Sequence, residues 1–328
     1  MNIKISPSTR IASSSILLLI FVVISIGMGS VYISPLETIQ TIFTRSEEMA
    51  TTIIWDLRIP RVAVAAIVGV NLALSGALLQ AVMRNPLADP GLTGVSSGAS
   101  VTVLAIMLVF PNFTSFVPIA AMIGGTIAVA IVYALAWKKN TISPVRILLA
   151  GVAVNAIFGG ITGLISILYS DRLPAALQWR NGSLGGKGMG DVAVLLPYSM
   201  IGWVLALFCI RSANLLSLGE KVASNLGENT NRIRILLSLV AVYLAAVSVS
   251  IVGLLGFVGL VVPHMARLIV GTNYRFVIPM SMVLGAVVLV IADTIGRTLF
   301  APLDLPAGII MAMVGGPYFL YLMRKGDV

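Results

Sequence analysis

The chain has 328 residues, of which 58% are hydrophobic and only 10% are charged, and its mean hydropathy is +1.04. A soluble domain carries about 25% charged residues, so this composition excludes that class and indicates a polytopic membrane protein. The net charge of +9 does not indicate a nucleic-acid partner, because the basic residues are spread over loops that flank apolar runs. The single cysteine, Cys209, excludes a disulfide, a zinc site or a CxxCH haem site within one chain.

The N-terminal segment mimics a signal peptide, because Lys4 and Arg10 precede an apolar run over residues 16–26. We interpret it as an uncleaved first span, since the apolar stretch continues to Tyr32 and the rest of the chain has membrane character.

Apolar runs recur along the whole chain, and at about 20 residues per span they predict an all-α protein of about ten transmembrane helices. The runs are 11–32, 62–82, 94–110, 116–137, 147–169, 191–210, 235–252, 254–270, 276–296 and 307–323.

Two connections between the runs are long. Residues 33–57 form an amphipathic connection with a helix start at Ser34-Pro35, and residues 170–190 form a glycine-rich connection. No soluble domain is apparent, so we expect residues 1–328 to form one transmembrane domain.

Lysine and arginine predict the orientation in the membrane. With alternating crossings, one side receives 14 of the 21 Lys and Arg residues. The richer side is expected to be cytoplasmic, which places both termini inside.

Residues 84–98, RNPLADPGLTGVSSG, interrupt the apolar pattern between two runs. Proline lacks an N–H and restricts the residue before it, so Pro86 and Pro90 break any helix there. A broken polar segment must lie at a membrane surface or line a watery cavity. A simple re-entry turn between two spans is the other interpretation.

Small residues in the run before this break predict a tightly packed central helix, because they let helix backbones approach closely in lipid. They are Gly69, Ala73, Ser75, Gly76 and Ala77.

Residues 211–234 form the longest polar stretch on the predicted cytoplasmic side. Its apolar residues could give a short helix one apolar face that docks into another protein, and a solvated loop is the other interpretation. These residues are Leu215, Leu216, Leu218, Val222 and Leu226.

Asp293 lies within the ninth run, and Arg297 follows it at i+4. The two can neutralise each other on one helix face, so a structural ion pair competes with a functional role. Acids are otherwise almost absent from the runs, which argues against a proton-driven pump.

Other candidate motifs favour structural roles. His264, the only histidine, is predicted to be hydrogen-bonded within the protein, and the methionines at i, i+2 spacing would make a poor copper ladder. The stretch at 181–188, NGSLGGKG, does not match the phosphate-loop pattern, because Asn181 stands at the position of the first glycine and Gly188 at the position of the Ser or Thr. Its glycines are therefore expected to form tight turns.

Three stretches together resemble the FecCD family, the membrane subunits of ABC importers for iron chelates, haem and cobalamin. They are RIPRVAVAAIVGVNLALSGALLQAVMRNPLADPGLTGVSSGA from Arg58, LSLGEKVASNLG from Leu216 and GLLGFVGLVVPHMARLIVG from Gly253, followed by the Asp293 and Arg297 pattern. Two departures are mild: Tyr274-Arg275 and Asp304–Gly308 stand where the family often has His-Arg and Glu-Leu-Pro-Val-Gly.

The resemblance implies a type II ABC importer permease of ten helices in the bacterial cytoplasmic membrane. It implies two protomers, identical or paralogous, with the pathway on their common axis. It also implies two cytoplasmic ATPase subunits, which hold ATP and Mg, and an extracytoplasmic substrate-binding protein. The chain itself is expected to hold no cofactor or metal and not to be an enzyme.

The resemblance also implies roles for particular residues. Within the 211–234 coupling loop, the ATPase contact is assigned to Leu218, Gly219, Glu220, Ala223, Leu226 and Gly227. Docking of the binding protein is assigned to Arg58 and Arg297. The inner-mouth gate is assigned to Asn85, Leu87, Pro144 and Val145.

Among substrates, an iron chelate of the siderophore type is expected first, with haem or cobalamin as alternatives. A secondary transporter or channel without an ATPase is the competing class, and in that case residues 211–234 are merely a linker. A membrane enzyme is a third class, but no catalytic constellation is apparent.

Overall fold

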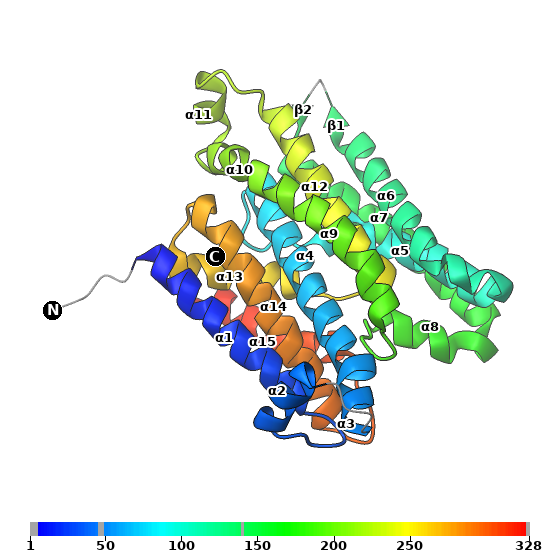
Figure 1. Cartoon of the computed structure of the whole chain (residues 1–328). Helices are drawn as coiled ribbons and strands as arrows, with labels where there is room; N and C mark the ends of the chain where they lie inside the picture. Colours follow the sequence, from blue (N-terminus) through cyan, green and yellow to red (C-terminus); the bar gives the residue numbers. More distant parts are fainter. Residues whose placement is uncertain (1–5, 45–48, 139–140, 326–328) are drawn as a thin grey trace.

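The computed structural model describes residues 6–44, 49–138 and 141–325, and it is built almost entirely of helices (Figure 1). In chain order the elements are α1 (Pro7–Gly27), α2 (Pro35–Phe43), α3 (Met49–Thr52), a π-helical segment (Ile53–Arg58), α4 (Ile59–Met83), a 3-10 turn (Pro90–Thr93), α5 (Val95–Leu104), a π-helical segment (Ala105–Val109), a 3-10 turn (Pro111–Phe116), α6 (Val117–Ala136), β1 (Trp137–Lys138), β2 (Thr141–Ile142), α7 (Pro144–Leu168), a 3-10 turn (Ser170–Arg172), α8 (Leu173–Arg180), α9 (Met189–Phe208), α10 (Ile210–Ser217), α11 (Glu220–Asn225), α12 (Thr230–Val252), α13 (Val258–Val270), α14 (Tyr274–Thr298) and α15 (Ala307–Lys325). The two short strands pair antiparallel.

The apolar runs predicted from the sequence each coincide with a helix, which confirms the helical membrane fold. Within the described residues, seven helical segments are long and apolar enough to cross a membrane. Three further apolar helices are shorter, at Val95–Val109, Val258–Val270 and Ala307–Leu322. The number of ten crossings therefore remains a prediction.

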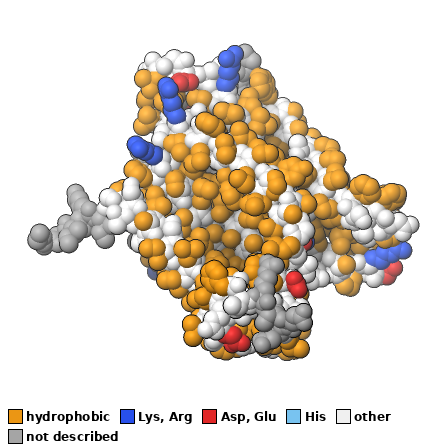
Figure 2. Space-filling view, in the orientation of Figure 1, with side chains coloured by type: hydrophobic (Ala, Val, Ile, Leu, Met, Phe, Trp, Pro, Cys, Tyr) orange, Lys and Arg blue, Asp and Glu red, His pale blue; other side chains and the backbone are white. Residues whose placement is uncertain are grey.

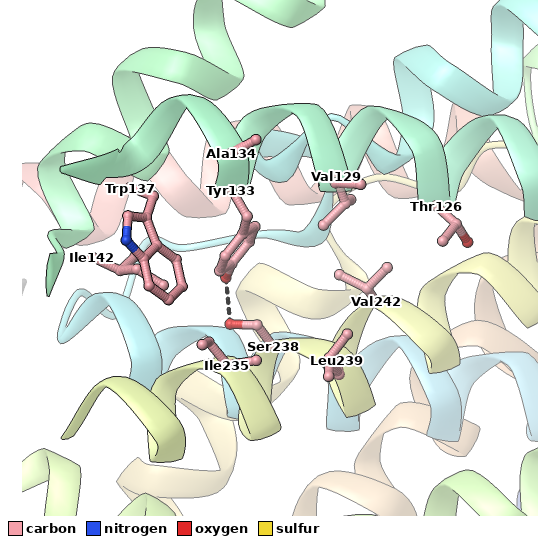
Figure 3. A pocket seen from close by; sticks show the side chains of 11 residues that line it. Thr126, Val129, Tyr133, Ala134, Trp137, Ile142, Ile235, Ser238, Leu239 and Val242 are labelled. Carbon is pink, nitrogen blue, oxygen red and sulfur yellow. Dashed lines mark hydrogen bonds between the residues drawn. The ribbon is translucent and has the colours of Figure 1, made fainter. Parts of the chain in front are cut away.

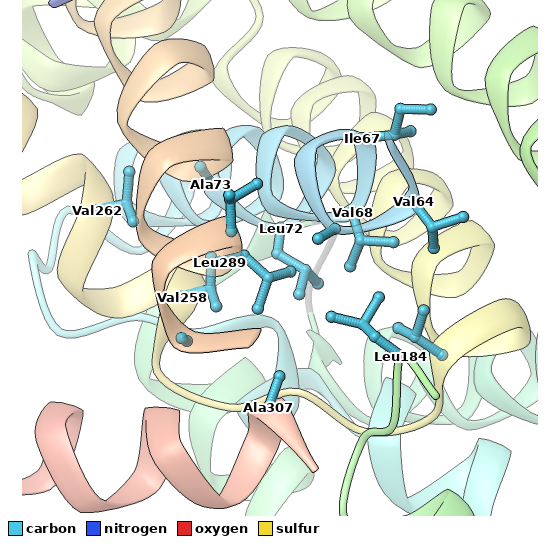
Figure 4. Close-up of a cluster of buried hydrophobic side chains, with 14 of the residues drawn as sticks. Val64, Ile67, Val68, Leu72, Ala73, Leu184, Val258, Val262, Leu289 and Ala307 are labelled. Atoms are coloured by element: carbon cyan, nitrogen blue, oxygen red, sulfur yellow. The ribbon is translucent and has the colours of Figure 1, made fainter. Parts of the chain in front are cut away.

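Helix α4 lies at the centre of the molecule, and 89% of its apolar window is buried. It packs against α14, α12, α13 and α9, so apolar side chains surround it (Figure 4). Its residues Val64, Val68 and Leu72 belong to the same buried cluster as Val258 of α13 and Leu289 of α14. A helix that is apolar on all sides fits either a protein core or a membrane span, and the helices packed around α4 give it the core position.

Two contacts of α4 depend on glycine, as its small residues predict. A Cβ atom on Gly69 would lie 2.1 Å from the carbonyl oxygen of Gly285, and one on Gly76 would lie 1.9 Å from that of Gly259. The backbones of α14 and α13 therefore touch α4 directly, which is how helices associate closely in lipid.

We expect Gly76→Val to destabilise the protein by about 3 kcal/mol or more, because the new side chain would push two backbones apart. Thermal unfolding of the detergent-purified protein would measure the loss. Gly159→Val on α7 is the matched control, since no atom lies within 4 Å of a Cβ there. Equal melting temperatures for the two variants would contradict this account of the packing.

The long connections are more helical than predicted. Ser34 caps α2 by accepting the N–H of Glu37 at 3.2 Å, which confirms the helix start at Ser34-Pro35. The apolar run 62–82 matches α4, but the connection before it is also helical from Met49 and continues into α4. The glycine-rich connection also contains α8, which its composition concealed. Gly182 and Gly186 in this connection have positive φ and form its turns, as expected.

The molecular surface has an apolar band between two more polar ends (Figure 2). Lysine and arginine side chains appear at the end that carries α11 and the β1–β2 hairpin, together with an acidic one, and both signs also appear beside α8, whereas acidic side chains appear near α2 and α3. The sidedness of the two ends in the membrane stays a prediction.

Candidate functional site

The polar stretch 211–234 folds into two short helices rather than one. α10 and α11 are separated by Leu218 and Gly219, and Gly219 has a φ of 113°, which a residue with a side chain rarely adopts. The glycine therefore redirects the chain and splits the apolar residues between the two helices.

The split leaves part of the apolar surface exposed. Leu216 and Ala223 are buried against the protein, whereas Leu218 and Leu226 are each 62% exposed and Val222 is also exposed. Gly227 is exposed as well. Of the predicted coupling residues, Leu218, Leu226 and Gly227 are thus open to a partner, and Gly219 and Ala223 shape the turn.

Arg234 connects this segment to the rest of the protein. Its side chain is almost fully buried at the start of α12, where it donates a hydrogen bond to the carbonyl oxygen of Ile142 and forms an ion pair with Glu220. Asn231 supports the same contact, because its side-chain oxygen accepts the N–H of Ile142 at 3.3 Å. Glu220 of α11 and the strand before α7 therefore meet at one guanidinium group.

Sequence reasoning counted Arg234 only as a cytoplasmic charge. The available signal was its place directly before an apolar run, where a basic side chain must reach a polar partner.

The predicted gate residues fall into two groups. Asn85 and Leu87 lie in the break after α4, where Arg84 adopts a left-handed conformation and the side chain of Asn85 accepts the N–H of Leu87 at 2.8 Å. Pro144 and Val145 begin α7, and Val145 is exposed.

A cavity of about 440 Å³ adjoins the first gate group. Arg84, Asn85 and Pro86 line it together with Ser217 and Leu218 at the end of α10. The structure thus brings Asn85 beside the coupling segment, whereas Pro144 connects to that segment through Ile142 and Arg234.

The rest of the break forms a second, shorter helical turn. Asp89 accepts the N–H of Gly91 at 2.8 Å and caps the 3-10 turn over Pro90–Thr93. Burial raises the pKa of Asp89 to about 6. The segment is therefore an ordered turn between α4 and α5.

Polar side chains of α5 and α7 meet beyond this turn. Ser97 donates to the side-chain oxygen of Asn155 at 2.6 Å, and the Asn155 amide donates to the carbonyl oxygen of Gly91 at 3.1 Å. A cavity of about 320 Å³ runs past these groups to Thr162 and Arg180. Polar groups at membrane depth are tolerated where they line a cavity.

The opposite end of the protein holds a compact network of charges. Arg61 of α4 binds Asp293 of α14 through both Nε and Nη2, at 2.7 to 3.0 Å, and it binds Asp304 at 2.7 and 2.8 Å. Arg297 approaches Asp293 at 3.5 Å and also donates to Ser25 of α1.

The predicted pair of Asp293 and Arg297 therefore exists, but Arg61 is the closer partner of Asp293. The pattern on α14 could not reveal it, because Arg61 lies on another helix.

Arg58 is also enclosed. Its side chain is 6% exposed, and its guanidinium donates to the carbonyl oxygens of Ile26 and Gly27 at 2.9 Å and to that of Val31. Arg58, Arg61 and Arg297 all line one cavity of about 400 Å³. The two arginines assigned to docking thus lie together, and each donates hydrogen bonds inside the chain through part of its guanidinium group.

His264 is buried in α13, with its ring edge-on to that of Tyr318 at a centroid distance of 6.4 Å. Among the residues that the structure describes, no three His, Cys, Asp or Glu side chains gather as they would around a metal ion.

A central helix with glycine contacts, several helices long enough to span a membrane and the exposed α10–α11 helix pair agree with the expected transporter permease. The FecCD transport family profile matches residues 17–325. The chain belongs to this family, whose members are permease subunits rather than enzymes, and it is a multi-pass protein of the bacterial cytoplasmic membrane.

Individual relatives cover nearly the whole chain. The Fe(3+)-citrate import system permease protein YfmE of Bacillus subtilis is 38% identical over 97% of this chain and 95% of its own length. The hemin transport system permease protein HmuU of Yersinia pestis is 36% identical over 99% of this chain and 98% of its own length.

A solved structure of a metal-chelate type ABC transporter in an inward-facing conformation superposes with a TM-score of 0.84. It is 28% identical and covers 98% of this chain and 100% of its own.

Proposed function

We propose that this chain is the permease subunit of a binding-protein-dependent ABC importer that carries an iron chelate into the cytoplasm. Two permease protomers, two ATPase subunits and an external binding protein would form the complete transporter. ATP hydrolysis on the partner subunits would supply the energy.

The observation that carries this proposal is the Arg234 contact. The exposed side chains of Leu218, Val222 and Leu226 offer an apolar surface to an ATPase, while Glu220 beside them holds Arg234. Arg234 in turn holds Ile142, two residues before α7 begins. Movement of α11 would therefore be transmitted to the helix that carries Pro144 and Val145, as rigid-body alternating access requires.

The polar cavity between α5 and α7 supports a substrate path along α7. Ser97, Asn155 and Thr162 give it hydrogen-bonding groups, and Arg180 places a positive charge at its far end. Much of α7 is exposed, with 22% of its apolar window buried, so a second protomer could complete the path. A weakly polar path suits a bulky chelate, because tight binding would trap it.

Iron chelates are the substrate class that we favour, and siderophores within it. Relatives named for ferric citrate and for iron hydroxamate are 38% and 32% identical to this chain. Relatives named for hemin and cobalamin are 36% and 40% identical, so these ligands belong in the same test.

The test is uptake into vesicles that contain the permease, its ATPase and its binding protein. We expect ATP-dependent accumulation of a labelled ferric siderophore, with less uptake of haem and cobalamin. Uptake that continues without ATPase subunits would instead support a secondary transporter or a channel.

Orientation can be tested with single cysteines. We expect Asn225→Cys on α11 to react only with membrane-permeant thiol reagents, and Asp171→Cys to react with impermeant ones, because these exposed residues lie on opposite sides in the predicted topology. Cys209 is buried, so we expect it to react little with either type of reagent. Reversed labelling would overturn the proposed sidedness.

A further inference from the structure

The side of the protein formed by α6 and α12 contains an apolar groove with a volume of about 500 Å³ (Figure 3). Val129 and Tyr133 of α6 face Val242 and Leu239 of α12 across it, and Trp137 and Ile142 of the β1–β2 hairpin close one end. Its volume falls within the range of about 300–1,000 Å³ that is typical of ligand sites. The groove is distinct from the cavities described above, with which it shares no lining residue.

The groove has one polar position on its wall. The hydroxyl group of Tyr133 donates a hydrogen bond to that of Ser238, which gives each a partner without a ligand. The other lining side chains are apolar except for Thr126, so the groove offers an oily surface rather than a site for a chelate.

With the sidedness predicted from the basic residues, the two helices place the groove in the cytoplasmic half of the membrane. α6 ends at Ala136 and α12 begins at Thr230, and these ends adjoin the same hairpin. The groove runs from these ends toward the membrane interior, as far as Thr126 and Val242. Trp137 is half exposed at its mouth, the depth at which amphipathic indole rings concentrate.

Positive charge lies at the same mouth. Lys138 follows Trp137 on β1 and is exposed. Arg232, which is also exposed, lies three residues before Ile235 on α12, so it extends the row formed by Ile235, Leu239 and Val242 toward the cytoplasm. The side chains that the structure describes in the groove carry no formal charge, so the mouth has no lining acid to neutralise these cations.

We propose that this groove binds one anionic phospholipid of the cytoplasmic leaflet. An acyl chain would fill the space between α6 and α12, and the phosphate would lie between Lys138 and Arg232. Each basic residue near an anionic membrane surface attracts such lipids, and the apolar groove adds burial of the chain.

The bound lipid would also support the coupling pathway. Ile142 lines the groove with its side chain and accepts the hydrogen bond of Arg234 with its carbonyl oxygen. The lipid would therefore brace the hairpin on its membrane side. Its binding depends on the groove alone and not on the identity of the transported substrate.

The test is native mass spectrometry of the full-length permease after reconstitution in equal amounts of phosphatidylglycerol and phosphatidylcholine. We expect the wild type to retain one phosphatidylglycerol molecule per protomer. Lys138→Glu with Arg232→Glu should lower the retained ratio of phosphatidylglycerol to phosphatidylcholine about tenfold. Arg275→Glu with Arg324→Glu is the matched control, because these exposed cytoplasmic cations lie outside the groove.

A second variant tests the acyl-chain part of the site. Ala134→Phe should fill the groove and reduce retention of both lipids, and its position is exposed, so folding should be maintained. A wild type that retains the two lipids equally would overturn the proposal, as would unchanged retention in Ala134→Phe. Loss of the preference in the control pair as well would show only general charge attraction and would also overturn it.

Discussion

Arg234→Gln is expected to reduce ATP-driven uptake by at least tenfold while the ATPase subunits continue to hydrolyse ATP. Glutamine cannot bind Glu220 and the carbonyl oxygen of Ile142 through one charged, forked group, as arginine does. α11 would then move with the ATPase without moving the start of α7. Uptake and hydrolysis, measured in the same vesicles, would reveal the uncoupling.

Two further variants separate this linkage from a general effect on folding. Arg234→Lys keeps the charge but not the fork, so it should retain part of the uptake. Arg211→Ala is the matched control, because this arginine is 85% exposed and lies 3.8 Å from Glu228, and surface pairs of this kind contribute about 0–1 kcal/mol. Normal coupling in Arg234→Gln, with normal binding of the ATPase, would contradict the proposed linkage.

The prediction for Glu220 is different, because its side chain is 49% exposed. Glu220→Gln leaves the buried Arg234 without its ion-pair partner, but water can reach the side chain at position 220, which is half exposed. We therefore expect a smaller loss of uptake than in Arg234→Gln. The order of the two losses follows from burial and not from the type of charge.

The sequence predicts the helices well because hydrophobic periodicity and length are local properties. The glycine contacts of Gly69 and Gly76 were also foreseeable, since small residues within an apolar run have few other uses. The helical segment over 49–58 was missed because the connection 33–57 offers a clear helix-start signal only at Ser34-Pro35. α8 was missed because glycines follow it closely and its eight residues are too few for a clear periodicity.

The charge contacts could not be predicted in the same way. Asp293 has a correctly placed neighbour at i+4, yet Arg61, 232 positions away, binds it with better geometry. Arg234 likewise reaches Ile142 across 92 positions. A single sequence contains the charges but not the packing that chooses between partners, so the local pair was the only one available to inference.

Arg58 and Arg297 provide the second large expected effect, because two roles compete for them. As docking residues they would present positive charge to acids on the binding protein. As structural residues they hold α1: Arg58 through the carbonyl oxygens of Ile26 and Gly27, and Arg297 through Ser25. Hydrogen bonds from a charged donor contribute about 1.5–3 kcal/mol each, whereas an exposed docking pair contributes about 0.2–1 kcal/mol.

We therefore expect Arg58→Gln and Arg297→Gln each to destabilise the permease by about 3 kcal/mol or more, seen as a lower melting temperature in detergent. Asp304→Asn is the control within the same network, because Asp304 is 45% exposed and Arg61 keeps Asp293 when it is changed. That variant should cost less than about 1 kcal/mol.

Lysine substitutions distinguish the two roles. Arg58→Lys and Arg297→Lys preserve the charge that a binding protein would meet, but lysine cannot reproduce the fork that reaches several carbonyl oxygens. If docking depends on charge, both lysine variants should bind the binding protein within about threefold of the wild type while melting at a lower temperature. Glutamine variants should lose both properties. Lysine variants as stable as the wild type would refute the structural role, and glutamine variants that bind as tightly as the wild type would refute the docking role.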